Sequence, residues 1–484
     1  MKTHTIFALT LILTNSALAA LPPDYEKQKA DAEKFYTDAS YAKAHEIYRA
    51  VNTTNFSANE ARWVAFRLAD TQWRSQAVTD NADTTKLDEA RANLEKQIRD
   101  LQRTDEHDRV WVEVQESLGD FSWTRRNNNN WGAAWPHYQA ALDWWAGTAD
   151  IETARVRYLA MVWRLAKPPG MERYYNYGNY GNIIPRDILE NALKIAQTDD
   201  DKAHAHYLLA MTLRNQGDPE TRARVADEFE GAIKPGKKTD WYDDALYNYA
   251  AWMEGQGKIV PLANGGWSVE PDYAKALELF RRFTNEFAKG ETRYWDDAKN
   301  QIKNITDPEV NVSVGNVFLP DSEIQYQLNW RNVKRITLTL YATELNRDVQ
   351  FPDNGKREVG WLQSINLNSL EKIKTWTRDT KDTGEYKPGS ETPRYDGKLK
   401  PGAYIIEASA DGKRTRDLLL VSDATLVLKN SGKQALAYLC NALDGSPLKA
   451  GKVKLWERWY ENSEWHARSQ VKDTDTNGIA VFDL

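Results

Sequence analysis

The chain changes its hydrophobic period near residue 305. Before that point apolar residues recur at helical spacing, and after it they alternate in the two-residue period of a strand. Because one segment cannot satisfy both periods, the change predicts a multidomain protein with α-helices first and antiparallel β-sandwich modules second. We expect four regions: a signal peptide at 1–19, an α-helical repeat domain at 20–305, a β-sandwich at 306–423 and a second β domain at 424–484.

The first residues have the pattern of a secretory signal. Lys2 gives a short basic start, an apolar stretch runs from Ile6 to Leu13, and Ala17-Leu18-Ala19 is typical of a cleavage site. We therefore expect a mature chain that begins at Ala20 and is exported to the periplasm or the extracellular space. The alternative is a buried N-terminal helix. No later segment reaches the roughly 18 apolar residues that a membrane span needs.

The charge and the aromatic content limit which classes of binding partner are expected. The net charge is −6, with no long basic run, so nucleic acid and anionic membrane surfaces are poor candidates. The 19 Trp and 23 Tyr residues suit either broad packing interfaces or surfaces that stack on ligand rings.

Two pairs of distant segments match within the helical region. Ser40–Arg49 aligns with Asp272–Arg281, and Trp241–Ala245 aligns with Tyr294–Ala298. Ser40 and Asp272 are candidate N-caps, and a small Ala in each copy allows close approach of a neighbouring helix. These pairs resemble degenerate tetratricopeptide repeats, which implies a surface for another protein. The alternative is an array that packs only on its own β domains.

Further helices are predicted between these segments. They cover 151–166, 203–215 and, more weakly, 131–145, where Pro136 requires a late start or a kink. The segment from Tyr174 to Asn182 contains four Tyr residues among Gly and Asn. It is predicted to be a connector whose rings cover neighbouring helices, or a surface that stacks on a sugar or a peptide.

Alternating strands follow residue 309. A turn is expected at Leu319-Pro320-Asp321, a long loop or linker at 378–400, and a hairpin at Asp411-Gly412. The last region has strand candidates at 425–429, 435–442, 452–456 and 479–482. With only about 60 residues against the roughly 100 of a typical sandwich, this module is expected to be incomplete.

Several motifs in the β half resemble bacterial alpha-2-macroglobulin-like proteins. The stretch Val317–Glu323, followed by Trp330–Val333 and Leu338–Tyr341, resembles the start of a macroglobulin domain. Leu399-Lys400-Pro401-Gly402-Ala403-Tyr404 resembles a hairpin of the same domains. The segments Asn441–Leu448, Gly451–Val453 and Thr474–Gly478 are similar to the next domain.

The resemblance implies an endopeptidase inhibitor that traps proteases. This sequence lacks the family's thioester motif, because Cys440 is followed by Asn441 and Ala442, and the bait region would lie beyond residue 484. We therefore expect the N-terminal part of a larger inhibitor, or a truncated relative. Residues 20–484 alone are expected neither to hydrolyse peptides nor to block proteases.

No catalytic, cofactor-binding or metal-binding residues are predicted. Cys440 is interpreted as a structural thiol, because no His is near it in sequence. The calcium-loop-like run Asp473–Gly478 has Leu484 where a bidentate Glu is needed, so it is interpreted as a hairpin turn. His204 and His206 are two residues apart and so face different ways on a helix, which argues against zinc. Gly255-x-Gly257 alone does not indicate a nucleotide site.

The function predicted from these observations is non-enzymatic. The leading hypothesis is an exported macroglobulin-like protein whose partners are endopeptidases. The alternative is a cell-envelope scaffold, or a glycan- or protein-binding module, that meets other envelope proteins through its helical array. No cofactor is expected.

Overall fold

A computed structural model describes residues 24–77, 83–125, 130–166, 184–215, 218–345 and 361–484. The signal peptide expected at 1–19 and the Tyr-rich segment 174–182 lie outside these residues. Among the described residues helices come first and strands dominate the C-terminal part, as the change of period predicts. Within the same residues, no helix is both long enough and apolar enough to span a membrane.

The chain divides into two compact units. The first, which we call the helical unit, comprises Met1–Tyr249 and Ile259–Ser268, and the second, the β-rich unit, comprises Ala250–Lys258 and Val269–Leu484. The last two helices, α12 (Tyr273–Glu286) and α13 (Trp295–Thr306), therefore belong with the strands that follow them, although the hydrophobic period grouped them with the earlier helices.

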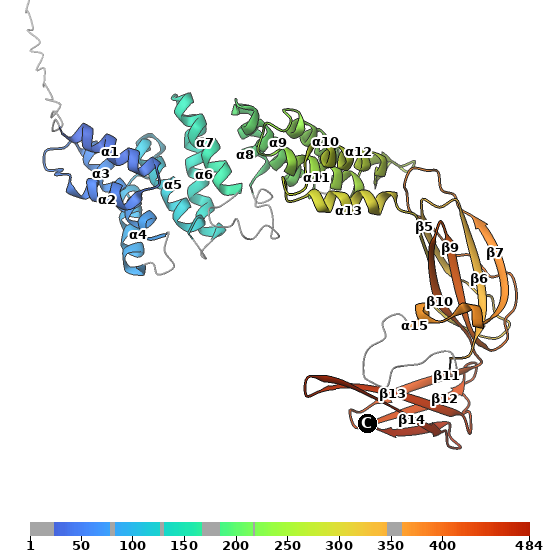
Figure 1. Cartoon of the computed structure of the whole chain (residues 1–484). Coiled ribbons are helices and arrows are strands. Elements are labelled where there is room, and N and C mark those ends of the chain that lie inside the picture. Colours follow the sequence, from blue (N-terminus) through green and yellow to red (C-terminus); the bar gives the residue numbers. More distant parts are fainter. Residues whose placement is uncertain (1–23, 78–82, 126–129, 167–183, 216–217, 346–360) are drawn as a thin grey trace, which may run out of the picture. The chain divides into compact units, whose positions relative to one another are not determined.

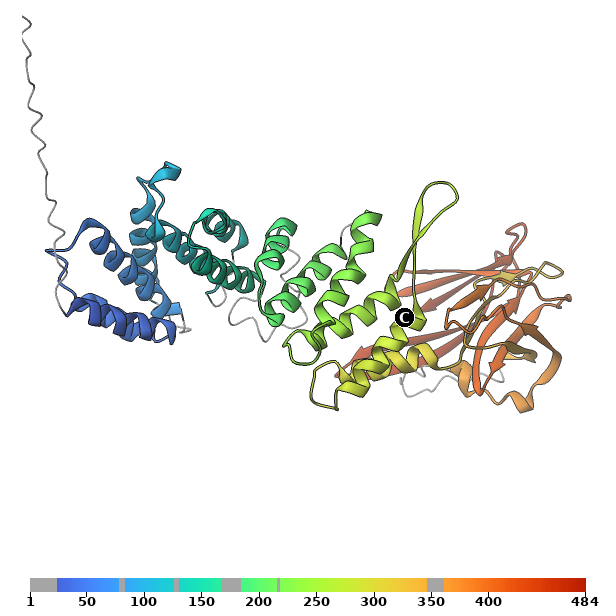
Figure 2. The ribbon, with the colours of Figure 1, turned by 90° about the horizontal axis from the view of Figure 1, so that it is seen from above.

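The helical unit is built from consecutive helices that lie side by side (Figures 1 and 2). Neighbours in sequence pack together, as in α1 with α2, α3 with α4, α5 with α6, and α9 with α10. The helices are α1 (Tyr25–Thr37), α2 (Tyr41–Ala50), α3 (Ala58–Ala77), α4 (Thr84–Ile98), α5 (Arg109–Trp123), α6 (Trp131–Gly147), α7 (Ile151–Ala166), α8 (Arg186–Ile195), α9 (Asp199–Leu213), α10 (Pro219–Ile233) and α11 (Tyr242–Gly255).

The repeated segments form helices with equivalent buried faces. Ala44 and Tyr48 of α2 are buried, as are their counterparts Ala276 and Phe280 of α12. Asp272 caps α12, since its side chain accepts a hydrogen bond from the Lys275 backbone N–H at 3.0 Å. Ser40 likewise occupies the N-cap position of α2, as predicted, but its side chain makes no capping hydrogen bond.

Pro136 does not delay the helix in which it lies. Helix α6 begins at Trp131, five residues before Pro136, and continues to Gly147. The prediction of a late start was therefore wrong. Asn130 caps the start of the helix, where its side chain accepts a hydrogen bond from the Ala133 backbone N–H at 3.1 Å.

A short two-stranded sheet separates α11 from α12. Its strands are β1 (Lys258–Pro261) and β2 (Trp267–Glu270). Gly257 stands before β1 with φ +68°, and a Cβ there would lie 2.0 Å from the Glu270 carbonyl oxygen. Its place in Gly255-x-Gly257 is therefore explained by a turn after α11.

The first β module is a sandwich of a five-stranded and a three-stranded sheet. The strand orders are β4-β10-β9-β6-β7 and β3-β5-β8. The strands of these two sheets pair antiparallel, as predicted, except β4 with β10, which pair in parallel. The strands are β3 (Glu309–Ser313), β4 (Val317–Phe318), β5 (Gln327–Arg331), β6 (Arg335–Thr343), β7 (Glu371–Asp379), β8 (Gly389–Glu391), β9 (Gly402–Ala410) and β10 (Lys413–Val421).

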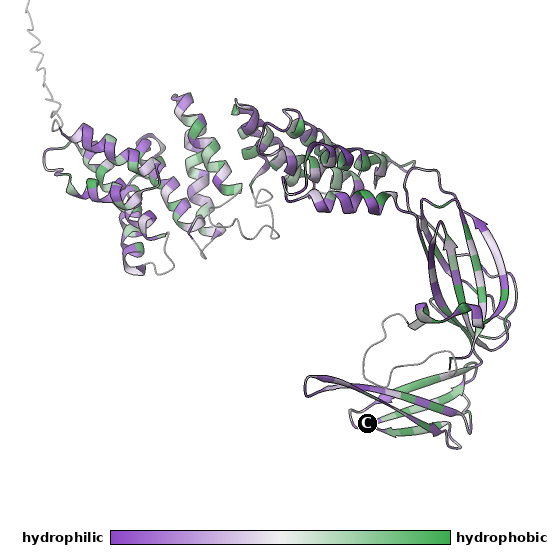
Figure 3. Ribbon diagram, in the orientation of Figure 1, coloured by the Kyte–Doolittle hydropathy of each residue, from purple (hydrophilic) through white to green (hydrophobic). Residues whose placement is uncertain are grey.

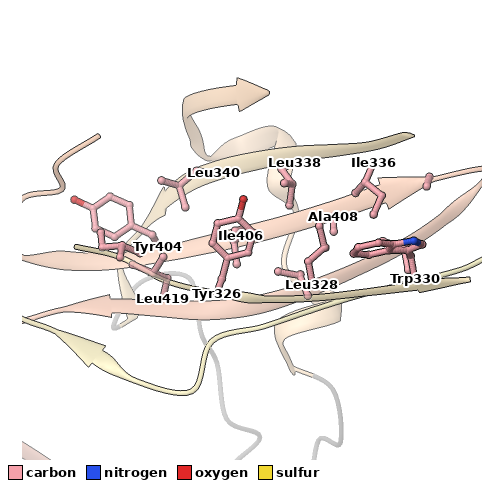
Figure 4. Packing of buried hydrophobic residues seen from close by; sticks show 14 of the residues in the cluster. Tyr326, Leu328, Trp330, Ile336, Leu338, Leu340, Tyr404, Ile406, Ala408 and Leu419 are labelled. Carbon is pink, nitrogen blue, oxygen red and sulfur yellow. The ribbon is translucent and has the colours of Figure 1, made fainter. Parts of the chain in front are cut away.

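Hydrophobic and hydrophilic residues alternate along the strands (Figure 3), and side chains from the two sheets meet in one core (Figure 4). Leu328 and Trp330 come from β5, and Leu338, Ile406 and Ala408 come from the larger sheet. The segment 378–400 is an internal loop of this module that includes β8, and therefore not a linker. Gly389 is needed in β8, because a Cβ there would lie 2.3 Å from the Trp330 ring.

Polar side chains from the first sandwich donate hydrogen bonds to the backbone carbonyl oxygens at the end of α13. Asn332 Nδ2 donates to the carbonyl oxygens of Ile305 at 2.7 Å and Asp307 at 3.2 Å. Arg331 donates to the Asn304 carbonyl at 3.0 Å. The last carbonyls of a helix have no partner within it, so these bonds stabilise the helix-to-strand junction.

The second β module contains five strands in two sheets. Strands β11 (Ala424–Asn430), β12 (Gln434–Asn441) and β15 (Ile479–Asp483) form one sheet, and β13 (Lys452–Glu461) and β14 (Glu464–Asp473) form the other. Strand β14 was not predicted, and β13 continues five residues past the predicted end at Trp456. The core between the sheets is small and contains Ala435, Ala437, Val453, Ala480 and Phe482.

Candidate functional site

The helical unit contains a buried network of arginines and carboxylates. Arg67 and Arg74 lie seven residues apart on α3, and Arg157 and Arg164 lie seven apart on α7. Seven residues are two helical turns, so each pair shares one face of its helix. Helix α5 supplies three acids of the network, Glu113, Glu116 and Asp120, all nearly inaccessible to solvent.

Arg67 is bound by acids from three helices. Its Nε and Nη2 donate to the two carboxylate oxygens of Glu33 at 2.8 and 2.7 Å, a bidentate geometry. Its Nη2 is 3.4 Å from Glu113, and its Nη1 is 3.7 Å from Asp70. The guanidinium also lies 4.1 Å from the centre of the Tyr36 ring, a cation–π distance.

Asp70 and Arg74 continue the network toward α5. Arg74 Nε donates to Asp70 at 2.8 Å, and Arg74 Nη2 donates to Asp120 at 2.8 Å. The Ser117 hydroxyl donates to Asp70 at 2.5 Å and accepts from the Trp73 indole N–H at 2.9 Å. Asp70 is fully buried, so these contacts replace the water that its charge would otherwise bind.

Arg157 and Arg164 close the network from α7. Arg157 Nη2 lies 2.9 Å from Glu116, and Arg164 Nε donates to Asp120 at 3.0 Å. Their side chains are 31% and 30% exposed, against 5% for Arg67, so α7 forms the solvent-facing edge of the network.

Helix α6 contributes two aromatic donors. The Tyr138 hydroxyl donates to Asp120 at 2.6 Å, and the Trp145 indole N–H donates to Glu116 at 2.6 Å. Each of these acids is thus held by an arginine and by a neutral donor.

The pKa shifts follow from burial and from the arginines. Burial raises the pKa of Glu116 above its usual value, against the opposing charges of Arg157 and Arg164. Burial also acts to raise the pKa of Asp120, but Arg164, Arg74 and the Tyr138 hydrogen bond outweigh it and the pKa is lowered. Charges of nearby acids likewise hold the pKa of Arg74 well above its usual value despite burial.

The chemistry of the network is structural. A general acid or base needs a proton-carrying atom within reach of a substrate. Glu116 has a raised pKa, but its two oxygens are already engaged, one by Trp145 and the other by Arg157. We infer that the network stabilises the packing of α3, α5, α6 and α7, because loss of one partner would leave a buried charge uncompensated.

Sequence reasoning missed this network. Its signal was present in α5, where Glu113, Glu116 and Asp120 recur at helical spacing inside an otherwise apolar stretch. Which arginines these acids meet could not be read from the sequence, because the partners lie more than 35 residues away in the chain.

His204 and His206 lie in separate surroundings. The His204 ring stacks between Trp163, with centroids 4.0 Å apart, and Trp241, with centroids 3.6 Å apart. His206 Nδ1 lies 2.8 Å from Glu228. Within the described residues, no group of three or more His, Cys, Asp or Glu side chains is arranged to hold a metal ion.

Cys440 and the calcium-loop-like run lie in the second β module. Cys440 is buried. Leu436 and Tyr438, which lie on the same side of β12, are only half-buried. Asp475 accepts hydrogen bonds from the backbone N–H groups of Asn477 and Ile479, both at 2.8 Å, and so forms a turn. The turn joins β14 to β15, which belong to different sheets, so the prediction of a hairpin was wrong.

Comparisons with known proteins give only distant likenesses. No protein-family model and no curated protein matches the chain. An Escherichia coli alpha-2-macroglobulin structure spanning domains MG0-NIE-MG1 is 10% identical with a TM-score of 0.27, and covers 36% of this chain and 57% of its own. A second spanning NIE-MG1 is 11% identical with a TM-score of 0.24, and covers 37% of this chain and 89% of its own.

A helical structure is also among the likenesses. The structure of the TPR2AB-domain:pHSP90 complex of yeast Sti1 is 15% identical with a TM-score of 0.18, and the match covers 57% of this chain and 96% of the other. The chain thus spans a little over half of the first macroglobulin fragment and nearly all of the other two structures. Likenesses at these scores carry no argument about family or function.

Proposed function

We propose that the chain is a non-enzymatic, exported macroglobulin-like protein of the endopeptidase-inhibitor class. The observation that carries the proposal is the position of the motif residues in the first β module. Several residues of the segments that resemble macroglobulin domains are buried in its core, namely Phe318, Trp330, Val333, Leu338, Leu340, Leu399 and Tyr404.

The Leu399–Tyr404 motif supports this proposal. Leu399 and Tyr404 are both buried in the core of the first sandwich. The Tyr404 hydroxyl donates to the Lys400 carbonyl at 2.9 Å, which ties the start of β9 to the segment before it. Pro401-Gly402 therefore turns the chain into β9 with a tyrosine fixed across the turn.

The Val317–Glu323 motif has a comparable role. Val317 and Phe318 pair in parallel with Leu420 and Val421 at the edge of the larger sheet. The turn after β4 is held by a hydrogen bond from the Ser322 N–H to the Leu319 carbonyl at 3.2 Å. Side chains with fixed structural roles support a resemblance better than a chance match of letters does.

The contacts made by the buried carboxylates support a non-enzymatic role. In the Arg–carboxylate network the buried oxygens of Glu116 and Asp120 are occupied by arginine, Tyr138 or Trp145. Catalytic carboxylates instead need an oxygen that a substrate can reach.

The proposal is tested with the native gene product purified from its source, beside a sample of residues 20–484. Each is added to a panel of endopeptidases, and cleavage of a large protein and of a small peptide is measured. We expect the native product to suppress cleavage of the large substrate alone, and residues 20–484 to suppress neither. Failure of the native product with every protease would refute trapping, and suppression of both substrates would indicate direct blocking of the active site.

The alternative is an envelope scaffold that binds other proteins through the helical unit. The observation that favours it is the partial exposure of Arg157 and Arg164 along α7, where a partner could add acids to the network. Co-purification from cross-linked cells decides between the two. Recovery of envelope proteins, lost on Arg157→Ala, would favour the scaffold, whereas recovery of endopeptidases would favour the inhibitor.

A further inference from the structure

The second β module repeats the strand order of the first but lacks two of its long strands. In the first module β3, β5 and β8 form one sheet, and β6 pairs with β7 in the other. In the second module β11, β12 and β15 form the equivalent sheet, and β13 and β14 form the equivalent pair. The first module also has β9, which pairs with β6, and β10, which pairs with β9. Residues 424–484, which are all described, contain no counterpart of β9 and β10.

The consequence is visible on β11, the strand that corresponds to β3. Val310 and Val312 of β3 are only 2% and 3% exposed, because β9 and β10 pack against that strand. Leu426 and Leu428 take the corresponding places on β11, and Leu428 lies opposite Ala437 of the core. They are nevertheless 48% and 54% exposed. Apolar side chains on the inner face of a sandwich are normally covered by the facing sheet, so the inner face of β11 lacks its cover.

The backbone of β11 also lacks a neighbour on one side. The Asp423 carbonyl accepts a hydrogen bond at 2.7 Å from the residue after β12, and backbone groups alternate in direction along an antiparallel strand. The N–H groups of Leu426 and Leu428 therefore point away from β12. In the first module the corresponding Val312 N–H donates to the Thr415 hydroxyl of β10 at 3.1 Å. Within the described part of the chain, no such side chain reaches the outward N–H groups of β11.

The opposite edge of the same sheet is closed. Lys472 Nζ and Gln470 Nε2 of β14 donate to carbonyl oxygens of β15, those of Val481 at 2.5 Å and Asp483 at 2.7 Å. Among the residues that the structure describes, none protects β11 in this way. Val427, between the two leucines, is 45% exposed, so β11 presents three successive apolar side chains to solvent. Natural proteins usually cover an exposed apolar edge strand, because it is a template for further strands.

We propose that a β-hairpin from outside residues 1–484 completes the second module. Its first strand pairs antiparallel with the free edge of β13, as β9 pairs with β6. Its second strand covers Leu426 and Leu428, as β10 covers the inner face of β3. That strand carries a Ser, Thr or Asp side chain where Thr415 stands in β10, to accept from the N–H groups of β11. Apolar side chains further along its inner face fill the core, as Leu419 does in β10.

The native gene product itself is the source that the strand order favours. In the first module β9 and β10 follow β8 in the chain, so the corresponding hairpin follows β15. Internal segments between the described ranges are too short to supply it. The longest, 167–183, has fewer residues than β9 and β10 together, which have 9 residues each. The inference rests on the proposed function, because a larger macroglobulin-like product has the further chain that the hairpin needs.

A second copy of the chain fits less well. Pairing of β11 with β11 of another copy would extend the sheet and would satisfy the outward backbone groups. It would not cover Leu426 and Leu428, because edge-to-edge pairing adds strands beside a sheet and leaves its inner face open.

The test compares the native gene product with residues 20–484 by hydrogen exchange and mass spectrometry. We expect peptides from β11 and β13 to exchange at least about tenfold more slowly in the native product, because the added hairpin protects both strands. Peptides from β6 and β9 should exchange equally in the two samples, because the first module is complete in both.

A substitution tests the buried face directly. Leu428→Glu should have little effect on exchange of β12 in residues 20–484, where this side chain is exposed. In the native product it places a carboxylate under the hairpin, so exchange of β12 should speed up at least about tenfold. The matched control is Leu443→Glu, which changes a turn residue that is 74% exposed and should have no effect in either sample.

Three outcomes would overturn the proposal. They are equal exchange of β11 in the two samples, equal effects of Leu428→Glu in both, and dimers of residues 20–484 in which β11 becomes protected, since these would assign the edge to a second copy. The assay against endopeptidases is read separately. A native product that traps proteases but does not protect β11 refutes this inference alone, and one that protects β11 but traps no protease refutes only the proposed function.

Discussion

Gly119 of α5 packs directly against the Tyr138 ring of α6, and replacing it with Ala should destabilise that contact. A Cβ at Gly119 would lie 2.9 Å from two atoms of the Tyr138 ring and 3.0 Å from a third. Contacts under 3.0 Å do not persist, so the ring or α6 must move. The ring is fully buried, and its hydroxyl is held by Asp120 at 2.6 Å.

The magnitude follows from three opposing effects. Overpacking a buried site costs about 1–3 kcal/mol, and weakening a buried hydrogen bond to a charged group costs about 1–3 kcal/mol more. Ala is favoured over Gly within a helix by about 1 kcal/mol. We therefore expect Gly119→Ala to lower the local stability of α5 and α6 by about 2 kcal/mol.

Hydrogen exchange followed by mass spectrometry measures this locally, which matters because a chain of several domains does not unfold in one step. Exchange in peptides from α5 and α6 should speed up roughly thirtyfold, while peptides from the first β module stay unchanged. Gly147→Ala is the matched control, since no atom lies within 4 Å of its Cβ, and it should keep or slightly raise protection. Equal protection in the two variants would refute the close-packing argument.

Three further predictions concern titrating and reactive groups. Asp120→Asn should destabilise the helical unit by about 3 kcal/mol, because Arg74 and Arg164 lose a buried counter-charge. The control Asp187→Asn changes an exposed residue and should have little effect on stability. Hydrogen exchange of α5 is measured in both variants. The native chain should be more stable than Asp120→Asn by the full amount above the unfolded pKa of Asp, about 3.9. This difference in stability should disappear as the pH falls through the folded pKa of Asp120, which is lowered. Hydrogen exchange of α5 at a series of acidic pH values checks this. Cys440 is buried, so a thiol reagent should label it slowly in the native chain and rapidly in denaturant; fast native labelling would contradict the packing around it.

Local signals in the sequence were sufficient for the order of helices and strands and for several individual elements, although α3, α4, α5, α8 and α10 were not predicted individually. Helix α7 has the predicted bounds at Ile151 and Ala166, and the hairpin at Asp411-Gly412 joins β9 to β10 as expected. Errors arose where distant contacts override local preference. Pro136 lies inside α6 although proline disfavours a helix interior. Strand β14 was missed although Trp465, Ala467 and Val471 alternate with polar residues along it.

At the candidate sites too, the sequence shows which residues are present, but only the structure shows which of them are in contact. Leu426 and Leu428 were visible in the sequence as part of the strand predicted at 425–429, but only the structure shows that they are exposed on the core face of their sheet. The acids of α5 were visible as residues, but not as partners of Arg74 and Arg164.

The order of the chain, helices before strands, was determined by the sequence alone, because hydrophobic period is a local property that each segment carries by itself. The tertiary structure alone decided which buried charges meet and that the last two helices belong with the β-rich unit. A buried charge is stable only beside a counter-charge, and for Asp120 that counter-charge comes from Arg74 and Arg164, each more than 40 positions away in the chain.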